Sequence, residues 1–250
     1  MKVIEVAAFV GTGLLGNPAG VCILDSPLEE AEMQETAARV GHAETAFLWP
    51  EGDDWRLRWF TPALEVDLCG HATLASAWVL AQEGKAGGLV TFNTRSGKLT
   101  AQVESDGAIV LDFPALVPEE YPLPASIGDL TKNAVWTGRS RDDWFAAFSS
   151  PDEVCTFVPD MEAIAEAGLR GLIITAPGEG DWDVVSRFFA PQSGVPEDHV
   201  TGSAHCAIGP YWRPEGGELL CLQASTRGGE LRVKVVGDRV FLKGFAKALE

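Results

Sequence analysis

Basic residues are scarce in this sequence. The 250-residue chain holds 19 Lys and Arg against 36 Asp and Glu, which gives a net charge of −17 at pH 7. Proteins that bind nucleic acids or anionic membranes do so with clustered Lys and Arg that replace counterions. No basic run is present here, so the composition excludes nucleic acids and anionic membranes as partners.

Long apolar runs are also missing. No stretch approaches the roughly 18 consecutive apolar residues that a membrane-spanning helix needs. The first residues, from Met1 to Glu5, enter an alternating, strand-like pattern and do not resemble a secretory signal peptide. We therefore expect a cytoplasmic protein.

Cysteine is sparse, and its spacing matches no ligand pattern. The five cysteines are an odd number and include no CxxC or Cys/His ligand spacing, so neither a disulfide framework nor a metal site is predicted. Cys22, Cys155, Cys206 and Cys221 stand in apolar surroundings and are expected to be small buried side chains. Cys69 stands beside a glycine that belongs to a repeated segment.

What the sequence does contain is one segment that occurs twice. Residues 70–75 (GHATLA) match residues 202–207 (GSAHCA), and residues 94–99 (TRSGKL) match residues 226–231 (TRGGEL). Both matches have the same offset of 132 residues (202 − 70). Self-similarity at a fixed offset indicates two related units. A small ligand is expected to bind in a cleft where the equivalent turns of the two units meet.

Each repeated segment predicts a helix that follows its glycine. Residues 72–83 are rich in Ala and Leu and contain no Gly or Pro, which predicts a buried helix of about three turns. Its small side chains permit strands to approach closely, as around a helix enclosed by a curved sheet. Pro210 interrupts the second helix, so the helix from Ser203 is expected to be shorter or kinked.

A proline-rich segment lies between the two repeats. Residues 114–124 are too rich in proline for a helix or a central strand, and they predict a semi-rigid linker. We therefore predict an N-terminal domain at residues 1–114 and a C-terminal domain at residues 115–250. This division leaves open whether the last strand, at the extreme C-terminus, packs on the first domain.

Both units approach the repeated glycine in the same way. An Arg-aromatic-Phe-x-Pro motif, at residues 58–62 and 187–191, precedes a loop that leads to Gly70 or to Gly202. A helix start presents backbone N–H groups at the positive end of the helix dipole, which favours a carboxylate by about 0.3–1 kcal/mol. Two helix starts facing one cleft would hold an acidic substrate. The alternative is that both glycines only allow a helix to pack closely against a strand.

Three titratable residues near these turns are candidates for proton transfer. Glu44 stands at the entrance of a strand with apolar neighbours, where burial would raise its pKa toward that of a useful general base. His71 follows the first repeated glycine, and Asp198 precedes the second one by four residues. Each also has an ordinary structural interpretation, because loop carboxylates and helix-start histidines are common without a function.

Four segments together are similar to the PhzF family of isomerases. They are residues 16–19 (GNPA), 44–47 (ETAF), 67–75 (DLCGHATLA) and 198–207 (DHVTGSAHCA), in that order and spread over most of the chain. The resemblance implies an α+β fold of two pseudo-symmetric domains, each a strongly curved, mostly antiparallel, barrel-like sheet around a central helix, as in diaminopimelate epimerase. It also implies a site between the domains, no cofactor and a homodimer.

The resemblance further implies roles for individual residues. Glu44 would be the proton-shuttling acid/base, and His71 and Asp198 would act with it at the catalytic centre. The substrate-binding residues that the resemblance implies are Asn17, Gly70, His71, Gly202 and Ser203. No metal ligand is implied.

The predicted function is that of a cofactor-independent isomerase that moves a proton on a small carboxylate by general acid/base catalysis. A two-thiol amino-acid epimerase or racemase is one alternative. The chain has half of the cysteine pair that such an enzyme needs, because Cys69 precedes Gly70 whereas Thr201 precedes Gly202. A non-catalytic protein of the same fold that binds a small ligand is the other alternative.

Overall fold

The computed structural model describes residues 1–213 and 216–249 of the chain, and it divides into two compact units. Unit 1 comprises Met1–Phe113 and Leu242–Glu250, and unit 2 comprises Pro114–Phe241. The last residues of the chain therefore belong to the first unit. Among the described residues, no helix combines the length and the apolar character that crossing a bilayer requires.

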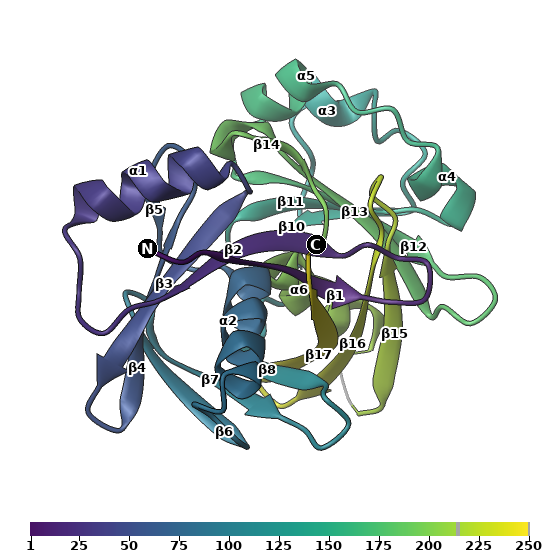
Figure 1. Cartoon of the computed structure of the whole chain (residues 1–250). Coiled ribbons are helices and arrows are strands. Elements are labelled where there is room, and N and C mark those ends of the chain that lie inside the picture. Colours follow the sequence, from purple (N-terminus) through teal and green to yellow (C-terminus); the bar gives the residue numbers. More distant parts are fainter. Residues whose placement is uncertain (214–215, 250) are drawn as a thin grey trace. The chain divides into compact units, whose positions relative to one another are not determined.

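Eight strands of unit 1 pair in a closed ring (Figure 1). In ring order they are β1 (Ile4–Val10), β2 (Asn17–Ile23), β3 (Glu44–Glu51), β4 (Asp54–Phe60), β6 (Leu89–Thr94), β7 (Gly97–Val103), β8 (Ile109–Pro114) and β17 (Arg239–Ala248), which returns to β1. The short strand β5 (Glu65–Val66) is added to β4. The β2–β3 and β4–β6 pairs are parallel, and the other pairs with a described register are antiparallel.

Helix α2 (Gly70–Gln82) runs inside this ring and connects the parallel strands β4 and β6 (Figure 1). Its buried residues point in every direction around the helix, from His71 to Leu80. A helix that is apolar on all sides is stable only when it is enclosed, and the alanines of this helix let β1, β2, β3 and β7 approach it. The buried helix predicted over residues 72–83 is present.

Helix α1 (Glu30–Val40) connects the other parallel pair, β2 and β3, and lies outside the ring. It packs Met33 and Ala37 against a cluster that includes Phe47 and Phe60. The helix ends at Gly41, which has a φ of 75°. Glycine adopts this left-handed conformation without the steric penalty of a Cβ, so the chain can turn directly into β3.

Unit 2 repeats this arrangement with further helices. Its strands are β9 (Glu119–Glu120), β10 (Trp136–Arg139), β11 (Asp143–Ala147), β12 (Gly171–Pro177), β13 (Val184–Ala190), β14 (Val195–Asp198), β15 (Glu218–Gln223) and β16 (Gly229–Val236). Its helices are α3 (Ala125–Gly128), α4 (Pro151–Cys155), α5 (Met161–Glu166), the 3-10 turn η1 (Pro191–Ser193) and α6 (Gly202–Trp212). The helices α4 and α5 pack on β12 and β13.

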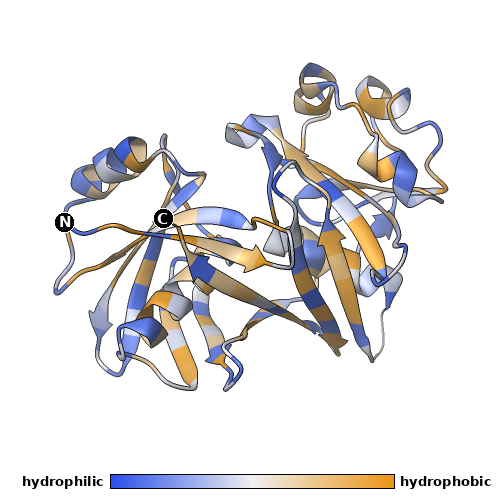
Figure 2. Cartoon of the chain, turned by 45° about the vertical axis from the view of Figure 1, so that its right-hand side comes forward, coloured by the Kyte–Doolittle hydropathy of each residue, from blue (hydrophilic) through white to orange (hydrophobic). Residues whose placement is uncertain are grey.

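The pairing pattern of the two units is the same, strand for strand. The parallel pair β2–β3 corresponds to β11–β12, the antiparallel pair β3–β4 to β12–β13, and the parallel pair β4–β6 to β13–β15. The hairpin β6–β7 corresponds to β15–β16, and both β6 and β15 bury every second residue. Figure 2 shows the resulting alternation of hydrophilic and hydrophobic positions along the strands. The repeat seen in the sequence therefore extends to the topology.

Two details of the sequence-based expectations have a clear outcome. Helix α6 contains Pro210 and has 11 residues against the 13 of α2, so it is the shorter helix, as predicted. The expectation that four cysteines are buried is wrong for Cys155, which is exposed at the end of α4, whereas Cys22, Cys206 and Cys221 are buried. Cys155 lies on the outer side of a short surface helix, and the apolar residues near it in the sequence do not cover it.

Candidate functional site

Asn17 and Glu44 begin two neighbouring parallel strands of unit 1. Asn17 is the first residue of β2, Glu44 is the first residue of β3, and the register pairs Ala19 with Glu44. Parallel neighbours start at the same edge of a sheet, so the two polar side chains are placed together. Asn17 is completely buried and the Glu44 side chain is 16% exposed.

His71 completes this group from the start of the enclosed helix. It is the second residue of α2, is buried, and lies two residues after the extended N-cap residue Cys69. Its Nε2 lies 3.3 Å from Oε2 of Glu44. On the other side of the imidazole, Nδ1 of His71 lies 3.2 Å from the amide Nδ2 of Asn17 and 3.5 Å from Sγ of Cys69.

These contacts assign the tautomer of His71. The amide nitrogen of Asn17 can only donate a hydrogen bond, and the thiol of Cys69 is a weak donor. Because both face Nδ1, we assign Nδ1 as the acceptor and place the ring proton on Nε2. The protonated Nε2 is then the nitrogen that lies 3.3 Å from Oε2 of Glu44. The imidazole therefore connects Cys69 and Asn17 on one side with Glu44 on the other.

The same group is the place where the described residues could hold a metal ion. The ligand atoms of Glu44, Cys69 and His71 all lie within 4.8 Å of one another. Carboxylate, thiolate and imidazole are ligands that zinc accepts. The contact between His71 and Glu44 suits proton transfer equally well, and the expectation that no metal is used stays a prediction.

In unit 2, Asp198 is held by the loop that leads into α6. Thr201 Oγ1 donates to Asp198 Oδ2 at 2.6 Å. The buried side chain of Gln223 binds both ends of this loop, because its Oε1 accepts from the backbone N–H of Thr201 and its Nε2 donates to the carbonyl of Asp198, each at 2.8 Å. Gln223 was missed in the sequence, since a single glutamine at the end of an apolar strand belongs to no motif.

The helix starts of the two units carry different side chains at equivalent positions. With the offset of 132 residues, Gly202 corresponds to Gly70 and Ser203 corresponds to His71. Ser203 is half-buried in the first turn of α6. Its hydroxyl can bind a ligand but is a weak base at neutral pH without an activating partner.

The strand register shows what stands in unit 2 where unit 1 has its carboxylate. Phe60 pairs with Thr45, and the corresponding Phe189 pairs with Leu172, so the preceding residue, Glu44 in unit 1, corresponds to Gly171. A Cβ at Gly171 would lie 2.4 Å from the carbonyl oxygen of Phe189. The backbone of unit 2 thus leaves no room for a side chain there, and the duplicated fold contains this carboxylate once.

An ion pair braces the loop before each helix. In unit 1, Arg58 donates two hydrogen bonds to Glu65, from Nε at 2.7 Å and from Nη2 at 2.6 Å. In unit 2, Arg187 donates to Glu197 from the same two nitrogens at 2.7 and 3.1 Å. The arginine of the repeated Arg-aromatic-Phe-x-Pro motif is therefore a structural residue, and its position fixes the strand that precedes Gly70 or Gly202.

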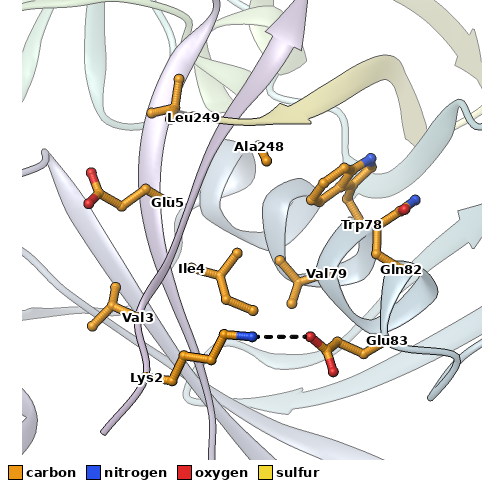
Figure 3. Close-up of a pocket in the computed structure, with 10 residues that line it drawn as sticks. All are labelled: Lys2, Val3, Ile4, Glu5, Trp78, Val79, Gln82, Glu83, Ala248 and Leu249. Atoms are coloured by element: carbon orange, nitrogen blue, oxygen red, sulfur yellow. Dashed lines mark ion pairs between the residues drawn. The ribbon is translucent and has the colours of Figure 1, made fainter.

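A cavity of about 400 Å³ in unit 1 lies away from this group (Figure 3). It is lined by the first residues of the chain, by the residues before the C-terminus, and by Trp78, Gln82 and Glu83 near the end of α2. Lys2 and Glu83 form an ion pair of 3.6 Å across it. None of the predicted site residues lines this cavity, so it is distinct from the group around Glu44.

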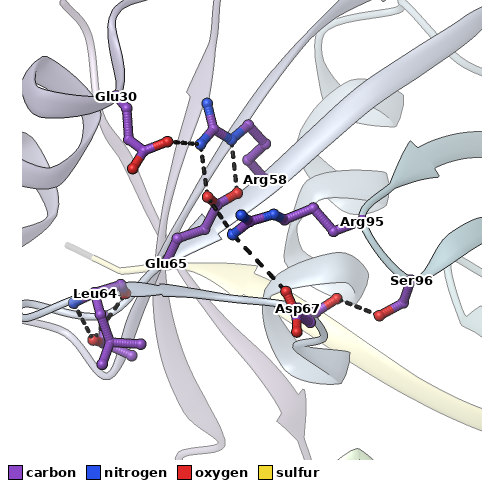
Figure 4. Close-up of polar contacts among 8 residues, drawn as sticks. Glu30, Arg58, Leu64, Glu65, Asp67, Arg95 and Ser96 are labelled. Carbon is purple, nitrogen blue, oxygen red and sulfur yellow. Dashed lines mark hydrogen bonds and ion pairs between the residues drawn. The ribbon is translucent and has the colours of Figure 1, made fainter.

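Close to the start of α2, a polar network joins several segments of unit 1 (Figure 4). Glu65 accepts hydrogen bonds from Arg58 and Arg95, and Arg58 also donates to Glu30 at 2.6 Å. Ser96 donates to the carbonyl of Asp67, three residues before Gly70. The network ties the loop between β5 and α2 to the β6–β7 turn.

The predicted site residues fall into two groups, one in each unit. Asn17, Glu44, Gly70 and His71 lie together in unit 1, with Cys69 in contact with them. The members of the second group are Asp198, Gly202 and Ser203 in unit 2. The expectation that both groups face one cleft stays a prediction.

Comparison with known proteins places this geometry in a family. The model of the family described as PhzC-PhzF, phenazine biosynthesis-like protein, matches residues 6–249 of the chain. An uncharacterized isomerase of Halalkalibacterium halodurans is 43% identical over 249 residues, which cover 96% of this chain and 93% of the relative.

Solved structures agree with this result. The crystal structure of a PhzF-family phenazine biosynthesis protein from Enterococcus faecalis has a TM-score of 0.92 and 37% identity, and it covers 99% of this chain and 96% of that one. A predicted epimerase from Pseudomonas aeruginosa has a TM-score of 0.76 and 19% identity over 99% of this chain and 96% of that one, and it shares the fold.

Proposed function

The chain belongs to the PhzC-PhzF family of phenazine biosynthesis-like proteins and is an isomerase, and we propose that it moves a proton on a small carboxylate through Glu44, without a cofactor. The α+β, epimerase-like fold predicted from the sequence is confirmed. The identity of the base and the class of substrate are the parts of this proposal that go further.

The contact between Glu44 and His71 is the observation that carries the proposal. A carboxylate with a largely buried side chain, 3.3 Å from an imidazole nitrogen, supports the role of a base that accepts a proton from carbon. The protonated Nε2 of His71 would orient this carboxylate through their 3.3 Å contact. After the first transfer Glu44 is neutral and can return its proton to a different carbon of the substrate, which completes an isomerisation without net gain or loss of protons.

The helix starts support a substrate with a carboxylate group. Helix α2 begins at Gly70 without a side-chain cap hydrogen bond from Cys69, and the first N–H groups of any helix point toward its N-terminal end. An anion at such a helix end gains about 0.3–1 kcal/mol, and up to about 2 kcal/mol in a partly buried site. A substrate carboxylate near Gly70 would lie beside the proposed base, and it would make a neighbouring C–H bond easier to deprotonate when the two are conjugated.

The two-thiol mechanism has less support. It needs one thiolate base and one thiol acid. The residue of unit 2 that corresponds to Cys69 at the offset of 132 residues is Thr201, which has no thiol. Cys69 also contacts Nδ1 of His71 at 3.5 Å, which fits a role in orienting the imidazole. The homodimer that the resemblance implies remains part of this proposal and can be tested by light scattering in solution.

Solvent exchange provides the test. Candidate small unsaturated carboxylates are incubated with the enzyme in deuterium oxide, and the incorporation of one carbon-bound deuterium is followed by NMR. We expect the E44Q variant to exchange about 10² to 10⁴ times more slowly than the wild type, the usual contribution of a positioned general base. Circular dichroism and the melting temperature of E44Q establish that the variant is folded.

E218Q is the matched control, because Glu218 carries an exposed carboxylate in unit 2. It should exchange at the rate of the wild type. A folded E44Q variant that also exchanges at the wild-type rate would show that another group is the base. A binder without catalysis would bind the same acids before and after the substitution and exchange none of them.

A further inference from the structure

A buried ion pair lies in unit 2 next to the position that corresponds to Glu44 of unit 1. Gly171, the counterpart of Glu44, pairs in register with Asp143. Arg170 precedes this glycine in the chain and donates to Asp143 from Nε to Oδ1 at 2.8 Å and from Nη2 to Oδ2. The Asp143 side chain is 1% exposed and the Arg170 side chain is 34% exposed. The carboxylate is therefore an internal anchor for a guanidinium that is still partly accessible.

A second contact fixes the guanidinium of Arg170. It lies over the ring of Phe188, with its Cζ 5.1 Å from the ring centroid. A Cβ on Gly171 would lie 2.8 Å from Cζ of the same ring, so the ring fills the space that a side chain at this position would need. A bidentate bond to a carboxylate and stacking on an aromatic ring both set the plane of a guanidinium. Asp143 and Phe188 together therefore hold Arg170 in one orientation.

The strand register brings Asp198 to the same place. Asp198 is paired with Phe188 across the antiparallel strands β13 and β14. Side chains directly opposite each other on such strands point to the same side of the sheet, with Cβ atoms about 4.5–5.5 Å apart. The guanidinium of Arg170 and the side chain of Asp198 therefore both lie next to the ring of Phe188.

The charges of Arg170 and Asp198 attract each other. Burial opposes the charged form of Arg170, yet its hydrogen bonds to Asp143 and the charges of nearby carboxylates, Asp198 among them, raise the pKa of the guanidinium above its ordinary value. The attraction is mutual, so the same cation favours the ionised form of Asp198. The bonds to Asp143 use Nε and Nη2, and Nη1 of Arg170 has no hydrogen-bond partner among the described residues.

The neighbours of Asp198 in the chain do not supply a positive charge. Burial lowers the pKa of His199 from its ordinary value of 6.5, so this residue is neutral at pH 7. Glu197 is an anion that accepts two hydrogen bonds from Arg187. Arg227 is a further cation of this region, and its charge lowers the pKa of His199. Its effect on Asp198 has to be separated from that of Arg170 by experiment.

We propose that Arg170 is a positioning residue for Asp198, whose carboxylate it keeps ionised and oriented in the isomerase. Unit 2 thus has a guanidinium beside the position where unit 1 has the carboxylate of Glu44, and this guanidinium serves a different acid of the predicted site. The catalytic part of the inference rests on the proposed function, in which Asp198 acts with Glu44. The electrostatic part concerns unit 2 alone and is measured without substrate.

Carbon NMR of protein labelled at the aspartate carboxyl carbons follows the titration of Asp198 directly, with the signal assigned through D198N. We expect R170Q to raise the midpoint of this titration by about 1 pH unit, because a cation that stabilises the carboxylate is lost. R170K keeps the charge and should titrate close to the wild type. R232Q is the matched control, because it removes an exposed arginine of unit 2 that is paired with Glu218, and it should leave the midpoint unchanged.

A double variant keeps the test valid if R170Q does not fold. R170Q deprives the buried Asp143 of its charged partner, which is expected to destabilise unit 2. D143N/R170Q removes both charges, and the two amides can still form a hydrogen bond. The midpoint of the Asp198 titration should rise in this variant as well, by a smaller amount, because the repulsion from Asp143 is removed at the same time.

Deuterium exchange of the substrate tests the catalytic part. The acid limb of the pH profile of exchange should move to higher pH in R170Q, by the amount that NMR measures for Asp198, and R170K should restore it. A purely structural role of the ion pair would lower the melting temperature without moving this profile. If E44Q exchanges like the wild type, the proposed base is wrong, and the NMR result for Asp198 is unaffected.

Three results would overturn the proposal. The first is an unchanged midpoint of the Asp198 titration in folded R170Q and in D143N/R170Q. The second is a midpoint that rises in R227Q and not in R170Q, which would assign the role to Arg227. The third is a raised midpoint in R170Q with an unmoved pH profile of exchange, which would show that the ionised form of Asp198 is not needed for the reaction.

Discussion

Arg58 holds Glu65 with two parallel hydrogen bonds, and Arg187 holds Glu197 with the same pair of nitrogens in the other unit. The Glu65 side chain is 5% exposed, so a bond lost here is not replaced by water. We predict that E65Q lowers the free energy of unfolding by about 2 kcal/mol or more, because it leaves Arg58 with the exposed Glu30 in place of a buried charged partner. Urea unfolding followed by fluorescence measures the change.

The control is E218Q, which removes one partner of the exposed ion pair between Arg232 and Glu218. Exposed pairs contribute less than about 1 kcal/mol, so E218Q should unfold almost like the wild type. Equal losses of unfolding free energy in E65Q and E218Q would mean that the ion pair of Arg58 and Glu65 stabilises the fold no more than an exposed pair does.

The same ion pair predicts a pH dependence. The hydrogen bonds from Arg58 are the main cause that lowers the pKa of Glu65 from its ordinary value of 4.5. A depressed carboxyl pKa contributes stability above the unfolded-state pKa, and this contribution is lost as the pH falls through the folded-state pKa. Between pH 5 and more acidic conditions, the wild type should therefore lose more stability than E65Q. An equal loss of unfolding free energy in the wild type and in E65Q across that range would contradict the prediction.

His71 is predicted to act by donating its Nε2–H to Glu44. The H71A variant should lower the rate of deuterium exchange by about 10² to 10³, the usual effect of removing one positioned donor. H71Q should retain more activity, because the amide nitrogen of Gln can take the place of Nε2. If H71Q and H71A are equally slow while both are folded, the donated hydrogen bond is not the contribution of this residue.

Cys69 is predicted to orient His71 and not to act as a base. C69S keeps a donor near Nδ1 of His71 and should exchange within about tenfold of the wild type, against the 10² to 10⁴ expected for a base. Cys155 is the internal control for alkylation, because it is exposed whereas Cys69 is buried. Iodoacetamide should therefore modify Cys155 first without loss of activity. Complete loss of turnover in C69S with Glu44 intact would support the two-thiol mechanism.

Much of this architecture could be predicted because its signals are local. The glycine of each repeated segment begins α2 or α6, and the alanine-rich composition after Gly70 reflects a helix that strands enclose. Asn17, Glu44 and His71 meet because two parallel strands and one helix start at the same edge. The motif residues in the sequence mark these starts.

Other features could not be predicted, because they depend on distant pairings. Gln223, at the end of β15, donates a hydrogen bond to the carbonyl of Asp198, and no local sequence pattern predicts this contact. The exposure of Cys155 depends on how a short helix sits on unit 2. The tautomer of His71 follows from Asn17, which is 54 residues away in the chain. Such features become visible only when the register of the strands is known.

Gly171 is predicted to be the position that keeps unit 2 from carrying a second carboxylate. A Cβ there would lie 2.4 Å from the carbonyl oxygen of Phe189 and 2.8 Å from the ring of Phe188. Backbone cannot move aside as a flexible side chain does, so G171A should lower the free energy of unfolding by about 2 kcal/mol or more. G128A is the matched control, because a Cβ at Gly128 meets no atom within 4 Å, and it should leave stability unchanged. A stable G171A variant would show that the strands adjust to the added atom.

His205 in α6 is predicted to set the acid stability of unit 2. The residue is completely buried, its Nδ1 lies 2.8 Å from the carbonyl of Thr201, and burial lowers its pKa from 6.5 to about 4. Below pH 6.5 the unfolded chain binds a proton at His205 that the folded chain does not bind until the pH approaches 4. The free energy of unfolding is therefore unaffected by His205 above pH 6.5 and decreases as the pH falls toward 4. At 1.36 kcal/mol per pKa unit this loss amounts to roughly 3 kcal/mol. Urea curves at pH 7 and pH 4.5 should differ less for H205N than for the wild type, even if H205N is less stable at both. Equal pH dependence in the two proteins would mean that His205 is not the group that titrates.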